Sequence, residues 1–208
     1  MRKLVFFLGP AGAGKTTIAK TLAKRYRAAL FDMDTMLRPA AAALMKLAGL
    51  DPEDRDSATY KSLCRDLGYR ITMDAALENI ELGTDAYVIG PFTKETESPE
   101  WLVKELESIG ASVENVEVKV VFVHLADSLS YYQRIKERGL SLDDWKLDNW
   151  NVFSQTLAIR DIHWDIPISH IFYYNNSVPS VPITDDSFMS VERFIYGSSS
   201  LNAERNEE

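Results

Sequence analysis

The sequence predicts an α/β fold in which a parallel sheet lies between helices on both faces. Short apolar runs typical of buried parallel strands alternate with amphipathic helical segments along the 208 residues. The first run, residues 4–8, leads directly into residues 9–16, GPAGAGKT, which match G-x-x-x-x-G-K-[ST] at every fixed position. Ile18, Leu22 and Tyr26 then recur at helical spacing. Strand, glycine loop and helix therefore follow one another in the order of a phosphate-binding loop.

Each residue type in this loop has a physical role in holding a nucleoside triphosphate. Glycines let the backbone curl so that consecutive N–H groups point at phosphate oxygens, and the positive end of the following helix adds to the attraction. The Lys15 ammonium can neutralise the β- and γ-phosphates, and the Thr16 hydroxyl can bind Mg²⁺. ATP and Mg²⁺ are therefore the predicted cofactors. The residues predicted to bind them in this loop are Gly9, Ala11, Gly12, Ala13, Gly14, Lys15, Thr16 and Thr17.

Composition limits the partners and the setting of the protein. The length fits one α/β domain over residues 1–196, and the polar residues 197–208 are expected to form a disordered tail. The net charge of −8 makes nucleic acid an unlikely partner and favours a small molecule. The single cysteine, Cys64, gives no disulfide framework, and no apolar run approaches the ~20 residues that span a bilayer. We expect a cytoplasmic monomer or homodimer without membrane contact.

Two carboxylates follow the second predicted strand, residues 28–31. Asp32 and Asp34 are two positions apart, so in extended backbone they project to the same side, at the edge of the sheet where ligands bind. Asp32 is then a candidate Mg²⁺ ligand together with Thr16, and Asp34 can orient and deprotonate an attacking hydroxyl. The alternative is that Asp34 only caps the next helix and Asp32 is a solvated strand end.

Residues 36–83 are predicted to be a helical insert that binds the phosphate acceptor. In a first helix, one apolar stripe contains Met36, Ala40, Leu44 and Leu47, and Pro39 is tolerable only in the first turn.

Ser57 and Thr72 are expected to cap two further helices of this insert. The helix after Ser57 should bury Tyr60, Leu63, Cys64 and Leu67, and the helix after Thr72 should bury Met73, Leu77 and Ile80. On the polar faces, Arg65 and Arg70 are the best candidates for substrate anchors. The alternative is that both are solvated surface charges.

Gly90 ends a buried strand that starts at Ala86. A glycine there permits close approach of a ligand to the backbone, so Gly90 is a predicted substrate contact, although an ordinary turn would look the same. Further predicted elements are a helix capped by Ser98 up to residue 109, strands over 116–125 and 169–174, and a helix over 186–196.

Residues 134–150 are predicted to form a lid. The helix capped by Asp127 should bury Leu129, Tyr132 and Ile135, which leaves Tyr131, Arg134 and Arg138 on its other side. Arginines beside a mobile turn can clamp phosphate charge as a lid closes, so Arg134 and Arg138 are catalytic candidates. A solvated, salt-bridged face that includes Glu137 is the alternative.

These motifs resemble those of the small P-loop kinases, such as shikimate, gluconate and nucleoside monophosphate kinases. The resemblance rests on GPAGAGKTT, the aspartates at 32 and 34, Gly90 and the two lid arginines. It implies a three-layer sandwich with a five-stranded parallel sheet in the order 2-3-1-4-5. By similarity to shikimate kinases, Asp32 would hold Mg²⁺ through water and Asp34 would bind the acceptor hydroxyl. The triple-glycine acceptor loop of shikimate kinases is absent, and IGPFTKE is similar to uncharacterised bacterial AAA-family ATP-binding proteins.

The expected activity is ATP-dependent, Mg²⁺-dependent phosphoryl transfer to a hydroxyl of a small molecule, with Lys15, Asp34, Arg134 and Arg138 as catalytic residues. A switch GTPase would need a guanine-reading N-K-x-D, which the sequence lacks. A motor-type ATPase is disfavoured because no acidic pair ends the third strand. The alternatives left open are a kinase acting on polynucleotide ends, a toxin-like kinase acting on a nucleotide sugar, and a non-enzymatic ATP-binding regulator.

Overall fold

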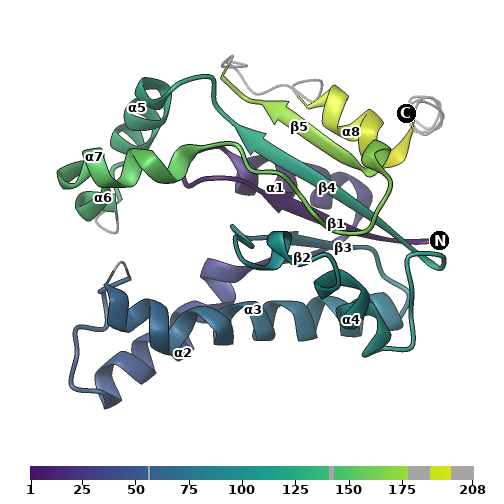
Figure 1. The fold of residues 1–208 in the computed structure, drawn as a ribbon, viewed down its shortest axis with the longest axis horizontal. Helices are drawn as coiled ribbons and strands as arrows, with labels where there is room; N and C mark the ends of the chain where they lie inside the picture. The colour runs from purple at the N-terminus through teal and green to yellow at the C-terminus, as the bar shows by residue number, and fades with distance from the viewer. Residues whose placement is uncertain (56, 141–142, 178–187, 198–208) are drawn as a thin grey trace.

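The computed structural model describes residues 1–55, 57–140, 143–177 and 188–197, and its centre is one parallel sheet (Figure 1). The strands are β1 (Arg2–Leu8), β2 (Ala29–Asp32), β3 (Ala86–Ile89), β4 (Val116–His124) and β5 (Ile171–Asn175). Their spatial order is β2-β3-β1-β4-β5, and every neighbouring pair is parallel. The predicted five-stranded sheet and its order are confirmed.

The central strand β1 separates two apolar cores. All five residues from Leu4 to Leu8 are 0% exposed. Because side chains alternate along a strand, Leu4, Phe6 and Leu8 enter the core on one face, whereas Val5 and Phe7 enter the core on the other. This explains why the run is continuously apolar rather than alternating.

Helices cover both faces of this sheet, as the sequence predicts. They are α1 (Lys15–Tyr26), α2 (Met33–Leu47), α3 (Ala58–Glu81), α4 (Trp101–Glu107), α5 (Ser128–Arg138), α6 (Asp144–Asp148), α7 (Trp150–Phe153) and α8 (Met189–Tyr196). Short 3₁₀ turns are η1 (Glu95–Glu97), η3 (Ser154–Leu157) and η4 (Ile168–His170). Helices α3 and α4 pack on one face, and α1, α5 and α8 pack on the other (Figure 1).

Helices α2 and α3 form a hairpin with a small core of its own. Leu37, Ala41 and Met45 of α2 pack with Cys64 of α3, which is buried. The two helices approach closely at Gly68, where a Cβ would lie 2.8 Å from Leu37 Cδ2. The predicted insert is therefore a helical hairpin that begins where β2 ends.

The prediction of two helices between Ser57 and Gly83 is wrong, because α3 is one helix of 24 residues. Ser57 caps it as predicted, since its hydroxyl accepts the Tyr60 N–H. The Thr72 hydroxyl instead donates to the Gly68 carbonyl oxygen one turn earlier, at 2.7 Å, so it does not open a new helix. Leu63 and Leu67, expected inside, are 45% and 38% exposed.

The predicted buried stripe of α2 is also wrong. Met33, Leu37, Ala41 and Met45 are buried, whereas Leu47 is 85% exposed. The apolar segment offers two neighbouring stripes at helical spacing, and packing against α3 selects between them. The helix also starts earlier than expected, so Pro39 lies in its second turn rather than its first.

Two other element predictions need correction, and a third is untested. Tyr131, placed on the outer side of α5, is 2% exposed because its hydroxyl accepts the Leu125 N–H inside the core, and Leu129 is 62% exposed. Helix α4 begins at Trp101, since the chain around Ser98 forms a turn first. Residues 186–187 and 198–208, predicted as helix start and tail, lie outside the described residues.

Within the described part of the chain, no helix has the length and apolar character required to cross a membrane.

Candidate active site

The glycine loop after β1 adopts a backbone that only glycine permits at its two ends. Gly9 has φ 125°, and a Cβ there would lie 2.1 Å from the Val123 carbonyl oxygen of β4. Gly14 has φ 98° and precedes α1, and a Cβ there would lie 2.4 Å from Asn176 Nδ2. The loop is thus pressed against β4 and the segment after β5, with the first turn of α1 directly behind it.

Lys15 reaches back across the loop. Its Nζ donates hydrogen bonds of 2.7 Å to the carbonyl oxygens of Gly9 and Pro10. Burial lowers the pKa of Lys15 to about 8, an effect that the negative charges of Asp34 and Asp32 oppose. The positive charges of Arg138 and Arg160 lower the Lys15 pKa further. Four charged groups from distant parts of the chain therefore lie within electrostatic reach of this ammonium.

The predicted metal ligands are brought together. The Thr16 hydroxyl donates to Asp32 Oδ2 at 3.1 Å, so the first turn of α1 faces the end of β2. A hydroxyl and a carboxylate are hard oxygen donors, and Mg²⁺ in proteins is commonly held by one or two such groups together with phosphate and water oxygens. The donor set therefore fits Mg²⁺.

Asp34 is the exposed carboxylate in the first turn of α2. The cap of this helix is Asp32, whose Oδ1 accepts the Asp34 N–H at 3.1 Å. The alternative in which Asp34 serves as the cap is therefore wrong. Its negative charge instead acts on Lys15, whose pKa it raises against the effect of burial.

The two predicted lid arginines have different surroundings. Arg134 Nη1 donates to the Ala13 carbonyl oxygen at 3.5 Å, and its Nη2 donates to the Asn176 carbonyl oxygen, so it braces the back of the glycine loop. Arg138 instead pairs with Asp143, and its charge acts on Lys15. Of the two, Arg134 contacts the glycine loop directly, whereas Arg138 acts on Lys15 only through its charge.

Arg65 lies beside the segment that follows β3. Its Nη2 donates to Thr93 Oγ1 at 3.1 Å and to the Glu95 carboxylate, and its guanidinium lies 4.7 Å from the centre of the Tyr69 ring. Its side chain is 17% exposed, so the alternative of a solvated surface charge does not describe it.

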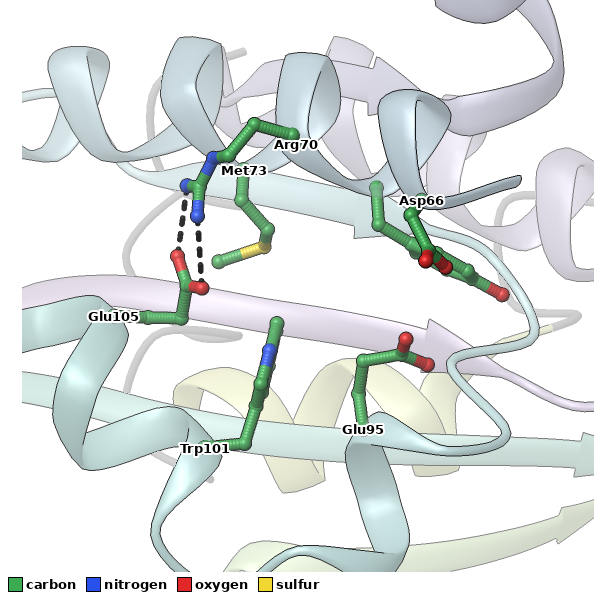
Figure 2. Close-up of a pocket in the computed structure, with 7 residues that line it drawn as sticks. Asp66, Arg70, Met73, Glu95, Trp101 and Glu105 are labelled. Atoms are coloured by element: carbon green, nitrogen blue, oxygen red, sulfur yellow. Dashed lines mark hydrogen bonds and ion pairs between the residues drawn. The ribbon is translucent and has the colours of Figure 1, made fainter. Parts of the chain in front are cut away.

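Arg70 points in another direction, toward α4. Its Nη1 and Nη2 donate to the two carboxylate oxygens of Glu105 at 3.0 and 2.8 Å (Figure 2). Its Nε pairs with Asp74 on the same helix. Arg70 and Glu105 border a pocket of about 170 Å³ between α3 and α4, which Met73 and Trp101 also line (Figure 2). The contacts tie Arg70 to α4, and its role as a substrate anchor stays a prediction.

Gly90 is required by packing. Its N–H donates to the Phe7 carbonyl oxygen, and a Cβ would lie 2.8 Å from the Phe92 ring. Phe92 is fully buried and has φ 42°, which is unusual for a bulky residue. The Tyr69 hydroxyl accepts its N–H and so helps to hold this bend. The segment after β3 is therefore firmly shaped where it faces Arg65.

Known proteins resemble this chain both in the sequence of the loop and in the fold. A family model described as shikimate kinase matches residues 11–47, which include the loop and both aspartates. The cytidylate kinase of Roseiflexus castenholzii is 43% identical over 63 residues, 30% of this chain. That match spans only 26% of the cytidylate kinase's own length.

Solved structures agree over nearly the whole chain. A protein from Chloroflexus aurantiacus has a TM-score of 0.61 at 12% identity, covering 92% of this chain and 94% of its own. A gluconokinase from Sinorhizobium meliloti 1021 has a TM-score of 0.50 at 13% identity, covering 97% and 99%. The chain has the fold of the P-loop kinases. The predicted resemblance to that superfamily is confirmed.

The sequence did not single out Arg160 or Asp143, and it marked Asn176 only as part of a polar loop that could hold the adenine base. Arg160 donates through Nη2 to the Pro91 carbonyl oxygen at 2.7 Å, while its Nη1 is buried and has no hydrogen-bond partner in the described part of the chain. Asn176 Nδ2 donates to the Ala13 carbonyl oxygen at 2.8 Å. Asp143 is the buried partner of Arg138. The local sequence does not reveal these contacts. Arg160 and Asn176 bind residues that are distant in sequence, and Asp143 lies in a stretch without helical periodicity.

Proposed function

We propose that this protein transfers the γ-phosphoryl group of ATP to a hydroxyl of a small molecule. The observation that carries the proposal is the convergence on Lys15 of a Thr16–Asp32 pair, the carboxylate of Asp34 and two arginines, at the carboxyl edge of the sheet. Phosphoryl transfer needs positioning and charge neutralisation more than a reactive side chain, and this set supplies both.

The residues of the loop bind and orient the nucleotide. Loop amides and the Lys15 ammonium neutralise the β- and γ-phosphates, and Arg138 adds positive charge from the lid, with Arg134 behind the loop. Thr16 and Asp32 would hold Mg²⁺, which supplies further charge neutralisation on the phosphate oxygens when bound. Asp34 accepts the proton of the attacking hydroxyl as that oxygen bonds to phosphorus, and ADP leaves with the electron pair of the broken P–O bond.

The acceptor would lie between the α2–α3 hairpin and the segment after β3. Thr93, Arg65 and Glu95 offer hydrogen bonds to hydroxyl groups, and the backbone at Gly90 borders the same segment. The buried Nη1 of Arg160 would bind a negatively charged substituent, because a buried donor without a partner is costly. The hairpin thus serves as the acceptor-binding insert, and residues 134–150 serve as the lid that excludes water.

The comparisons support this class of acceptor. The shikimate kinase model covers the nucleotide loop together with Asp32 and Asp34, and the gluconokinase neighbour shares the overall fold. Both names refer to kinases of small hydroxyl compounds. Oligomeric state and cellular location stay predictions.

The test uses the full chain with Mg·ATP and a panel of sugars, sugar acids, nucleosides and nucleotides. We expect acceptor-dependent ADP formation that Asp34→Asn lowers at least about 100-fold while ATP affinity changes less than threefold, because general-base groups contribute at this level. Asp165→Asn, the same change at an exposed position, should behave as wild type.

Three results would contradict the proposal. Equal turnover in Asp34→Asn and wild type would remove Asp34 from the reaction. ATP binding without transfer to any small molecule would favour a regulator, and transfer only to nucleic acid ends or a nucleotide sugar would favour the corresponding alternative.

A further inference from the structure

Asp143 is a fully buried carboxylate that the proposed reaction does not itself use. Its residue is 0% exposed, and it lies between Arg138 at the end of α5 and Lys146 of α6. Arg138 donates to it through Nε and through Nη2, the latter at 2.6 Å, and Lys146 Nζ lies 2.9 Å from Oδ1. A buried carboxylate of this kind is tolerated only because it is paired.

The charges of this trio do not cancel. One carboxylate faces one guanidinium and one ammonium, which leaves a net charge of +1 for the trio. Although burial opposes it, hydrogen bonds from Arg138 and Lys146 hold the pKa of Asp143 below its ordinary value. The carboxylate is thus ionised at neutral pH, and the surplus positive charge persists.

The hydrogen bonds also leave one edge of Arg138 available. The guanidinium is planar with five N–H donors in a fixed arrangement, and Asp143 occupies the Nε–Nη2 edge. Within the described residues, Nη1 of Arg138 has no hydrogen-bond partner. The Arg138 side chain is 37% exposed, and its charge reaches Lys15.

We propose that Asp143 is a positioning residue, which fixes Arg138 so that its Nη1 donors face the phosphoryl group in transfer. The inference rests on the proposed function, because it assumes that a phosphoryl group passes between Lys15 and Asp34. Asp143 does not touch the nucleotide. It acts through Arg138 alone, and its contacts with Arg138 and Lys146 join α5 to α6.

The test compares binding of Mg·ADP with binding of Mg·ADP plus aluminium fluoride, a mimic of the phosphoryl group in transfer, by calorimetry. We expect Arg138→Ala and Asp143→Asn each to weaken binding of the mimic at least about tenfold, since charge-assisted hydrogen bonds are the strong ones. Affinity for Mg·ADP alone should change less than threefold. In an Arg138→Ala background, Asp143→Asn should add nothing further.

Controls keep the test decisive. Asp165→Asn should match wild type. If Asp143→Asn does not fold, the pair Asp143→Asn with Lys146→Met keeps the net charge of the trio at +1 and replaces it in every comparison.

Three outcomes would overturn the inference. In the first, Asp143→Asn weakens binding of the mimic further in a protein that already has Arg138→Ala. In the second, Asp143→Asn weakens binding of ADP and of the mimic equally. Either result would show that Asp143 has only a structural role. In the third, wild type binds the mimic no tighter than ADP, which removes the proposed function and this inference with it.

Discussion

For a single residue such as Lys15, the motif predicts the role, whereas the surroundings set the pKa. The sequence identifies the lysine of the loop, but its lowered pKa arises from burial among groups that are distant in sequence. In the free protein the ammonium donates to the carbonyl oxygens of Gly9 and Pro10, which are weaker acceptors than phosphate. A triphosphate should therefore draw the lysine away from the loop carbonyls and favour its charged form.

ATP affinity should consequently depend on pH through Lys15. In the free protein the group loses its proton as the pH rises through about 8, whereas the bound phosphates keep it protonated. Affinity should therefore be constant up to about pH 8 and fall by up to about tenfold per pH unit above it. Calorimetry between about pH 7.5 and 10 measures this, and Lys15→Arg, charged throughout, should remove the slope. The same slope in both proteins would contradict the assignment.

Alanine substitutions at Gly14 and Gly110 can distinguish the effect of a left-handed backbone from the effect of a close contact. Gly14 and Gly110 both have positive φ, 98° and 66°, but only Gly14 has a neighbour where a Cβ would lie. Replacing either by alanine should cost about 1–2 kcal/mol of unfolding free energy because of the left-handed backbone. Only Gly14→Ala should also lose ATP binding. Urea denaturation and calorimetry test this, and retained ATP affinity in Gly14→Ala would refute the role of the close contact with Asn176.

Helices α2 and α3 show, at the scale of elements, where pattern reading stops. Their existence and their position after β2 follow from apolar spacing, but Thr72 suggested a boundary that the structure lacks. Threonine can cap a helix or bond back to the carbonyl one turn before it, and tertiary packing decides between the two. For α2 the choice between neighbouring apolar stripes likewise depends on the partner helix, which local sequence does not contain.

Two substitutions distinguish the stripes of α2. Met45 is 1% exposed and Leu47 is 85% exposed, although they are two residues apart. Met45→Ala should cost about 2–4 kcal/mol of unfolding free energy through lost burial and a cavity. Leu47→Ala should cost less than about 0.5 kcal/mol. Chemical denaturation measures both, and a larger loss for Leu47→Ala would show that the hairpin packs by the other stripe.

At the scale of the whole molecule, the sheet was predictable because its signals are strong and agree. The glycine loop fixes the edge at which ligands bind, and continuous apolar runs identify strands covered on both faces. The P-loop kinase resemblance then supplies the strand order. The candidate nucleotide-binding residues follow from that motif, and Thr16 and Asp32, predicted as metal ligands, are in contact.

The acceptor side was less predictable, because its residues meet only in three dimensions. Arg160, for example, reaches Pro91 from 69 positions away. Gly90 illustrates the converse, since its lack of a Cβ leaves room for the buried Phe92 ring. Arg70 resembles Arg65 in sequence context, but it is a residue of α3 that binds Glu105 of α4.

The central claim is that the sheet edge presents the terminal phosphate of ATP to an alcohol steered by Asp34. The most direct test supplies ATP labelled with ¹⁸O in its γ-phosphate, together with a small-molecule extract of cells, and follows the label by mass spectrometry without assuming an acceptor. We expect a labelled organic phosphate monoester with wild type and with Asp165→Asn, and none with Lys15→Ala or Asp34→Asn. Label that stays in ATP, or that appears only in inorganic phosphate, would contradict it.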